Sequence, residues 1–208
     1  MSILGDRLRG RYQLDPWGAD PQLVDLLDPI VGVAWRVQAT GTEHLPSSGP
    51  VVLVTNRRVG LAEPFIVGRA VRKATGRRVR FLGIPDVAPA GAVLRRLGGA
   101  VEHTAELAGL LRAGHIVALP LGQTWRKPLR AGPIGADALV PALELAAPIV
   151  PVAVIGGEIT GRWRVAIGEA IDPPASRTPL ALAQVAEVAR AGVQALLDEA
   201  FPPRWLLG

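Results

Sequence analysis

Short runs of apolar residues that have no polar face are the feature that most constrains the fold of this chain. The run Val51–Val54 is apolar at every position, and Ile116–Leu121 and Ile149–Ile155 have the same character. Strands of this kind are buried on both faces, which is typical of a parallel sheet covered by helices on each side. Stretches of helical periodicity lie between them, so the alternating order predicts an α/β fold.

The chain of 208 residues has no internal repeat and no long linker, and it is expected to form a single domain. Within it, 1–35 is an N-terminal amphipathic helical segment, 36–174 is the core, and 175–208 is a C-terminal helix and tail. The expected strands are Arg36–Thr40, Val51–Val54, Val79–Ile84, Ile116–Leu121, Ile149–Ile155 and Trp163–Ile171. The expected helices are Pro21–Trp35, Glu63–Thr75, Ala92–Leu97, Thr104–Arg112, Gly135–Ala146 and Pro179–Phe201. Gly76 is expected to close the second of these helices and the Thr104 hydroxyl to cap the fourth, while Gly98-Gly99 is expected to be an ordinary turn.

The formal net charge of +5 comes almost entirely from arginine, because Lys73 and Lys127 are the only lysines. A basic excess favours anionic partners such as phosphate or a membrane surface, although the same arginines also suit solvated helix and turn surfaces. Nucleic acid is not expected as a partner, since one Tyr and three Phe leave little for base stacking. The longest apolar run is too short to cross a bilayer, and no secretory signal is recognisable, so a cytoplasmic location is expected.

Active sites of open α/β sheets lie at the carboxyl ends of the strands. Three groups of side chains follow predicted strands in this chain. They are Asn56-Arg57-Arg58 with Glu63, then Glu102-His103, and Leu119–Thr124.

In order and spacing, these groups and the segments around them resemble the glycerolipid acyltransferase family that includes the lysophosphatidic acid acyltransferases. The resemblance runs from about Asp28 to Pro174. The matching blocks are Arg36–Pro46 with Gly49–Asn56, Leu111–Thr124, Gly135–Leu139 with Ala147–Gly156, and Val165–Pro173. Several blocks in one order are far more specific than a single motif.

The resemblance implies transfer of an acyl group from coenzyme A or acyl carrier protein, as co-substrate, to a lipid hydroxyl, with no bound cofactor. The first motif of the family is Asn-His, four residues, then Asp, in which the histidine is the general base and the aspartate orients it. Asn56 matches, but Arg57 occupies the histidine position and Ala62 the aspartate position, with Glu63 one residue late. A guanidinium cannot accept a proton at neutral pH, so Arg57 cannot act as that base.

The other motifs are altered at their chemical side chains too. At or beside the phosphate-binding arginine of the second motif, this chain has Glu102 and His103, and Phe-Pro-Glu-Gly of the third motif is Leu119-Pro120-Leu121-Gly122. The residues that build the fold are kept, and those that carry the chemistry are lost. We therefore expect a degenerate site with Asn56, Arg57, Glu63 and His103 at the catalytic positions. Arg58, Glu102, Leu121, Gly122, Gln123 and Thr124 are expected to line the binding site.

Two replacements for the lost dyad are open. His103 is the candidate base, with a polar residue before a helix as the alternative, whereas His115 opens a strand at the wrong edge of the sheet. An Arg57–Glu63 ion pair would instead fill the dyad site without catalysing a reaction. No phosphate loop, Gly-x-Ser-x-Gly elbow or metal-ligand spacing is present in the sequence.

The expected function is therefore that of a non-catalytic pseudoenzyme that binds a lipid, an acyl chain or a protein partner. The alternative is an active acyltransferase with a rebuilt site, using His103 as base or Arg57 and Arg58 to stabilise an oxyanion. A third hypothesis is an interaction subunit of a membrane-associated complex. Trp35 and Trp205–Leu207 either seat on the membrane interface or pack against the domain.

Overall fold

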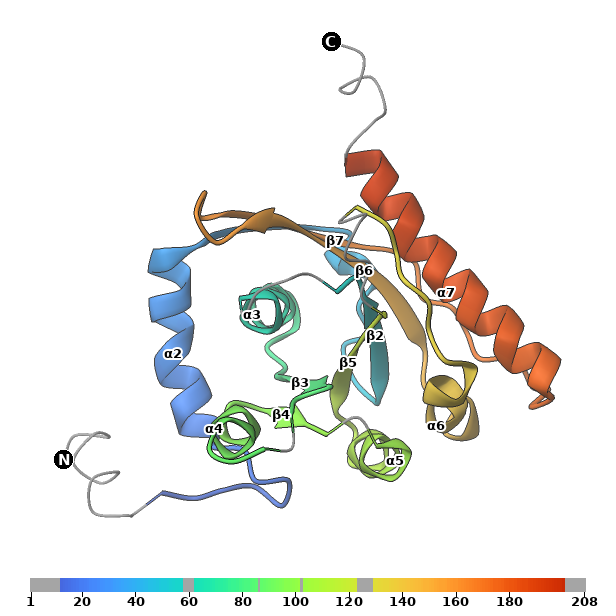
Figure 1. Ribbon diagram of the computed structural model, residues 1–208, viewed down its shortest axis with the longest axis horizontal. Helices are drawn as coiled ribbons and strands as arrows, with labels where there is room; N and C mark the ends of the chain where they lie inside the picture. The colour runs from blue at the N-terminus through green and yellow to red at the C-terminus, as the bar shows by residue number, and fades with distance from the viewer. Residues whose placement is uncertain (1–11, 58–61, 86, 102, 123–128, 201–208) are drawn as a thin grey trace, which may run out of the picture.

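The computed structural model describes residues 12–57, 62–85, 87–101, 103–122 and 129–200. Within these residues a single sheet runs through the molecule in the order β1-β7-β6-β2-β5-β3-β4 (Figure 1). Its strands are β1 (Arg36–Thr40), β2 (Val51–Thr55), β3 (Val79–Leu82), β4 (Gly99–Ala100), β5 (Ile116–Pro120), β6 (Ile149–Gly157) and β7 (Arg162–Ile167). Neighbouring strands are parallel except for β6 and β7, which are antiparallel. The predicted α/β domain with a largely parallel sheet is confirmed.

Helices cover both faces of the sheet. The helices are α2 (Pro21–Ala34), α3 (Glu63–Thr75), α4 (Ala90–Arg96), α5 (Thr104–Arg112), α6 (Val140–Glu144) and α7 (Pro179–Ala200), with 3₁₀ turns at Thr42–His44 and Ala136–Leu139. In β2, Val51 and Leu53 pack with α3, whereas Val52 and Val54 pack with α5, α6 and α7. All four side chains are fully buried, so the apolar run is apolar because the strand has a core on each side.

Most predicted elements are found with the same bounds or nearly so. The prediction is exact for Glu63–Thr75, which ends at Gly76 in the left-handed conformation (φ 72°). The strand expected to reach Ile171 ends at Ile167, and the prediction is wrong in three further places. Gly99 lies in the two-residue strand β4, the expected helix at Gly135–Ala146 is a 3₁₀ turn followed by α6, and α5 is capped by His103 rather than by Thr104. The tail residue Phe201 and Trp205–Leu207 lie outside the described residues.

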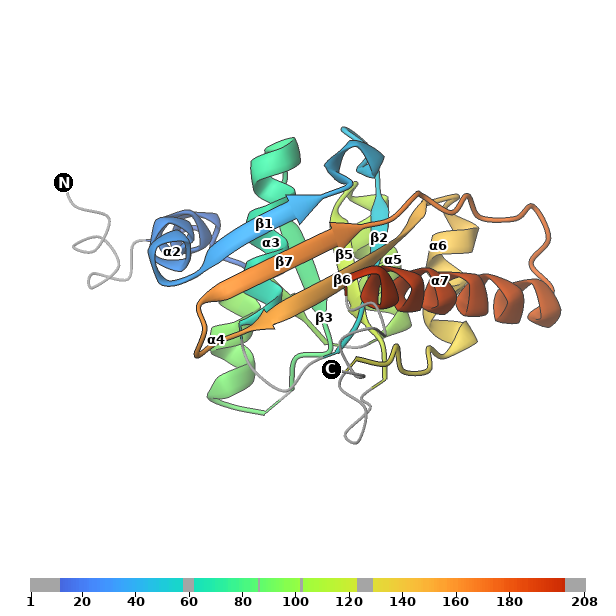
Figure 2. The ribbon, with the colours of Figure 1, turned by 90° about the horizontal axis from the view of Figure 1, so that it is seen from above.

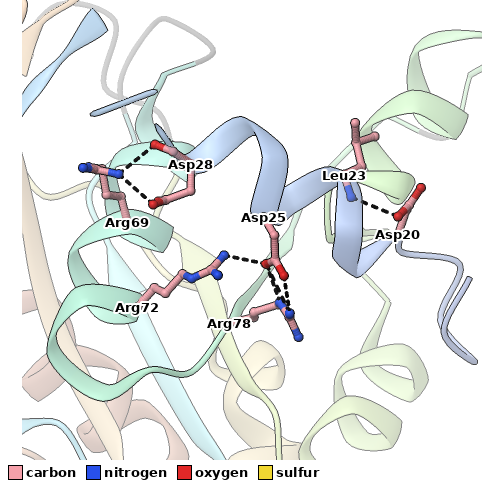
Figure 3. A network of polar contacts seen from close by, with 7 residues as sticks. All are labelled: Asp20, Leu23, Asp25, Asp28, Arg69, Arg72 and Arg78. Carbon is pink, nitrogen blue, oxygen red and sulfur yellow. Dashed lines mark hydrogen bonds and ion pairs between the residues drawn. The ribbon is translucent and has the colours of Figure 1, made fainter. Parts of the chain in front are cut away.

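Helix α2 is held on the outside of α3 by ion pairs rather than by a buried face. No residue of α2 is buried, although Val31 packs against the core beneath it. Asp28 pairs with Arg69 at 2.7 Å, and Asp25 pairs with Arg72 at 2.6 Å and with Arg78 at 2.9 Å (Figure 3). The opposite side of α2 is left to the solvent.

Helix α7 is long and apolar enough to cross a bilayer when length and composition alone are considered. One third of its apolar window is buried in the protein, where α7 packs on β6 and β2. Its exposed side carries Glu187 and Asp198. This arrangement is that of a helix on the surface of a domain.

Candidate functional site

A cleft of about 210 Å³ opens at the carboxyl ends of β2, β3 and β5. This is the edge of the sheet at which the sequence predicts the site. The cleft is lined by Arg57, Glu63, Pro64, Phe65, Phe81, Leu82, Gly83, Ile84, Pro85, Leu94, Leu97, Gly99 and Pro120. Its wall is mostly aliphatic and aromatic, with Arg57 and Glu63 contributing the two charged side chains among the described lining residues.

The Asn56 side chain has a structural role, because it is hydrogen-bonded to the backbone of β6. Its side chain is buried, with 2% of the residue exposed. The amide nitrogen Nδ2 donates to the carbonyl of Val154 at 3.0 Å, and the Val154 N–H donates to Oδ1 at 2.6 Å. The amide therefore extends the pairing of β2 with β6 by one step, and both of its ends are occupied. Asn56 acts as a positioning residue that fixes where the chain leaves β2.

Arg57 and Glu63 lie at the same cleft without pairing with each other. Arg57 is exposed. The Glu63 carboxylate accepts a hydrogen bond from the Thr55 hydroxyl at 3.3 Å. Among the ion pairs that join described residues, none connects Arg57 to Glu63. The expected ion pair is thus not formed, because the carboxylate at the start of α3 turns to the end of β2.

Glu158 is a second carboxylate at this place, and the sequence does not single it out. It lies in the turn between β6 and β7, and its Oε1 accepts the N–H of Ala62 at 3.2 Å. Ala62 is the position at which the family pattern has its aspartate. A carboxylate therefore stands beside that backbone after all, supplied from 96 residues away. No local motif could have signalled it, since the contact depends on the pairing of β6 with β2.

The altered third motif forms a packed turn. The Leu121 N–H donates to the Thr55 carbonyl at 2.8 Å, and the Gly122 N–H donates to the Pro133 carbonyl at 2.7 Å. The Leu121 side chain is fully buried in the core, so it does not face the cleft as a ligand contact would. The neighbouring residue Pro120 forms part of the wall instead.

His103 caps α5, and it is not among the residues that line the cleft. Its Nδ1 accepts the N–H of Ala105 at 3.2 Å. In a neutral ring that accepts at Nδ1, the proton resides on Nε2, which then donates and has no free lone pair. The four other predicted site residues, Arg58, Glu102, Gln123 and Thr124, lie outside the described residues.

His115 is found at the amino-terminal edge of the sheet, as the sequence predicts. Burial lowers the pKa of its imidazole, and the charges of Arg80 and Arg77 lower it further. His115 opens β5 at the edge opposite the cleft, and it therefore cannot serve the cleft as a base. In the part of the chain that the structure describes, no group of three or more acidic or histidine side chains is placed to hold a metal ion.

Sequence comparison finds relatives of this chain among mycobacterial proteins. No family model matches the chain. An uncharacterised protein of Mycobacterium leprae is 30% identical over 174 residues, covering 75% of this chain and 47% of that protein. Uncharacterised proteins of Mycobacterium tuberculosis and Mycobacterium bovis are 28% identical over 174 residues and are covered to 49%. The chain thus spans about half the length of these relatives.

A solved structure extends the comparison. The 1-acyl-sn-glycerophosphate acyltransferase PlsC from Thermotoga maritima superposes with a TM-score of 0.62 at 18% sequence identity, covering 84% of this chain and 80% of that one. The chain therefore has the fold of that acyltransferase.

Proposed function

We propose that this acyltransferase-fold protein binds a single-chain anionic lipid in the cleft without transferring an acyl group. The observation that carries the proposal is an apolar cleft at the family's reaction edge whose mouth presents Arg57 where a general base would stand. The apolar chain of the ligand would lie in the cleft, and its anionic head group at Arg57.

The size and lining of the cleft suit part of an acyl chain. At about 30 Å³ for each water-sized group, its 210 Å³ holds roughly seven of them, and a methylene is of similar size. Phe65, Phe81 and Leu97 are among the lining residues, and burying a methylene among such side chains is worth about 0.8 kcal/mol.

Arg57 suits an anionic head group. A guanidinium presents planar N–H donors that match carboxylate and phosphate oxygens. The head group of the ligand is therefore expected at Arg57, with the apolar chain along the aliphatic and aromatic lining.

The absence of transfer is expected from the side chains at the family's reacting positions. Arg57 cannot accept a proton, and Ala62 has no carboxylate to orient an imidazole. The described histidines His44 and His103 make their hydrogen bonds to Ile167 and Ala105, and not to the Glu158 carboxylate beside Ala62. The lipid class itself comes from the Thermotoga maritima neighbour, which is a 1-acyl-sn-glycerophosphate acyltransferase.

Calorimetric titration with oleate and with lysophosphatidate tests the binding. We expect Arg57→Ala to weaken binding by about tenfold, since one charge-assisted hydrogen bond is worth about 1.5 kcal/mol. Ile84→Asp, which places a charge in the wall, should abolish it. The control is Arg112→Ala, at an exposed arginine on α5. Equal affinity in Arg57→Ala and the wild type, or an equal loss in Arg112→Ala, would refute the proposed site.

The alternative is an active transferase with a rebuilt site. It is favoured by the place of His103, which follows β4 on the side where the cleft opens. The variant His103→Asn decides it, because asparagine caps helices well but cannot act as a base. If His103 were the base, this variant would lose transfer while keeping its melting temperature. Undiminished transfer would exclude His103 and leave only the version in which Arg57 and Arg58 stabilise an oxyanion.

A peripheral location at the cytoplasmic face of a membrane belongs to the same proposal. The solvent side of α2 carries Leu26, Ile30 and Val33, with 36%, 59% and 90% of each residue exposed. This spacing forms one stripe along the helix, as in helices that lie in a membrane interface. We expect Val33→Asp to release the protein from sedimenting anionic vesicles, while Val188→Asp on α7, also exposed, has no effect. Vesicle binding that survives Val33→Asp would favour the interaction-subunit hypothesis, in which α2 contacts a protein.

A further inference from the structure

In the described part of the chain, no helix covers one face of the sheet where β1 pairs with β7. The inward side chains Trp163, Val165 and Ile167 pack in the core with α3. On the other side α7 covers β6 and β2 but stops short of β1 and β7, as Figure 2 shows from above. The outward residues Arg36, Gln38, Arg162 and Arg164 are exposed, whereas Ala166 at the end of β7 packs partly against the core.

The uncovered face carries three arginines close together. Arg36 lies opposite Arg162 in the parallel pairing, and Gln38 lies opposite Arg164. Neighbouring strands are about 4.8 Å apart, so the first pair sets two like charges side by side. Like charges in this position destabilise a sheet. None of the three arginines is in an ion pair with a described residue.

Carboxylates lie next to this face on the other side of a groove. The groove has a volume of about 660 Å³, and it is lined by Arg164 from β7 and by Glu169 and Glu199. Both carboxylates are exposed and form no ion pair with a described residue. Asp198 and Glu199 end α7, where the negative end of the helix dipole disfavours carboxylates. The surface thus holds separated basic and acidic halves, and each half is placed unfavourably in the isolated chain.

We propose that two copies of this chain associate through the β1–β7 face in a dimer with two-fold symmetry. In an isologous interface, if one residue contacts a second across the axis, the second contacts the first in return. An axis along the groove places Arg162 and Arg164 of each copy against Glu169 and Glu199 of the other. Every charge pairing is therefore made twice, and the cross-strand repulsion of Arg36 and Arg162 is relieved.

A second copy fits this face better than a purely anionic partner does, because the face carries both positive and negative side chains. An anionic bilayer or an acidic peptide would satisfy the arginines but would meet Glu169 and Glu199 as like charges. The groove floor also provides apolar contact through Ala166 and Leu196. The proposal does not depend on what the cleft binds, since the cleft lies at another edge of the sheet.

Sedimentation velocity of the full chain over the micromolar range tests the proposal. We expect a dimer for the wild type that dissociates as salt is raised, because the contacts are ionic. Arg162→Glu with Arg164→Glu, the acidic variant, should be monomeric. Glu169→Arg with Glu199→Arg, the basic variant, should also be monomeric. Arg112→Glu on α5, a single charge reversal away from this face, is the control and should remain dimeric. Circular dichroism of each variant checks that it is folded.

Sedimentation of a mixture of the acidic and basic variants is the decisive experiment. Each restores the complement that the other has lost, so an equimolar mixture should sediment as a heterodimer. The proposal would be overturned if the acidic variant self-associated or if the wild type were monomeric at the highest concentration. It would also be overturned if a mixture of the two folded variants stayed monomeric. Binding of the monomeric wild type to anionic vesicles, lost in the acidic variant, would assign the face to a bilayer instead.

Discussion

Asn56 illustrates how a residue that matches a catalytic motif is held by the fold. Its amide makes two hydrogen bonds to the backbone of Val154 in a buried setting. In Asn56→Ala the Val154 N–H and carbonyl lose their partners, and we expect the free energy of unfolding to fall by about 2–4 kcal/mol. Urea denaturation measures this. Gln22→Ala, at an exposed amide on α2, is the control and should change stability little. Wild-type stability in Asn56→Ala would show that the Asn56–Val154 hydrogen bonds do not contribute to the free energy of unfolding.

His115 gives the chain a pH dependence at the residue scale. Burial, then the charges of Arg80 and Arg77, lower the pKa of its ring below the ordinary value of 6.5. The unfolded chain therefore binds a proton at higher pH than the folded one does. The stability linked to His115 is complete above the unfolded pKa, near 6.5, and is lost as the pH falls through the folded pKa.

We expect the free energy of unfolding to decrease on acidification through that window, and to decrease less steeply in His115→Gln. Denaturation curves at a series of pH values measure the two slopes. Parallel slopes for the two proteins would mean that His115 titrates alike in the folded and unfolded chain. Asp15, Arg77, Arg78 and Arg80 line the same surface groove as His115 and need to be kept unchanged in the comparison.

At the scale of elements, α2 depends on Asp25. Burial by itself raises the pKa of this carboxyl group, but hydrogen bonds and charge from Arg78 and Arg72 prevail and lower it. The contribution is present above the ordinary pKa of 3.8 and is lost as the pH falls through the folded value. Because these side chains are partly exposed, Asp25→Asn should cost only about 1 kcal/mol or less at neutral pH.

Hydrogen exchange should localise the effect of Asp25→Asn. We expect the amides of α2 to exchange faster at neutral pH while those of β2 keep their protection, and the difference from the wild type to vanish in acid. Uniform loss of protection across the chain would instead show that Asp25 contributes to global stability. Unchanged exchange in α2 would show that contacts other than those of Asp25 hold this helix on the domain.

Elements were predictable where the signal is local. Helix α3 begins at Glu63-Pro64 and ends at Gly76, and proline at the start with glycine after the end is a sequence signature of such a helix. Strand β4 is only two residues long, so its pairing with β3 leaves no periodicity to read. The same limit applies to the site. Asn56, Arg57 and Glu63 could be predicted to lie together because all three follow β2 within one connection. Glu158 and the wall residues Phe81 and Leu97 depend on strand pairings that the sequence does not display.

At the scale of the whole molecule, the chain has the fold of an acyltransferase, and residues that the resemblance places at the reacting positions have structural roles. Asn56 joins two strands, the place of the third-motif carboxylate is a buried leucine, and His103 caps a helix. An apolar cleft lies at the edge of the sheet where the sequence predicts the site. Under the proposed function, the protein binds a lipid in this cleft and does not catalyse the proton transfer that an acyl-transfer reaction needs.

Acyl transfer measured directly is the test of that claim. The purified chain is incubated with labelled acyl-coenzyme A, and in parallel with acylated carrier protein, in the presence of lysophosphatidate, beside an active 1-acyl-sn-glycerophosphate acyltransferase as the positive control. We predict no acylated product above the reaction without protein, from a sample that binds lysophosphatidate in calorimetry. Turnover by the wild type that disappears in Arg57→Ala or in His103→Asn would contradict the account.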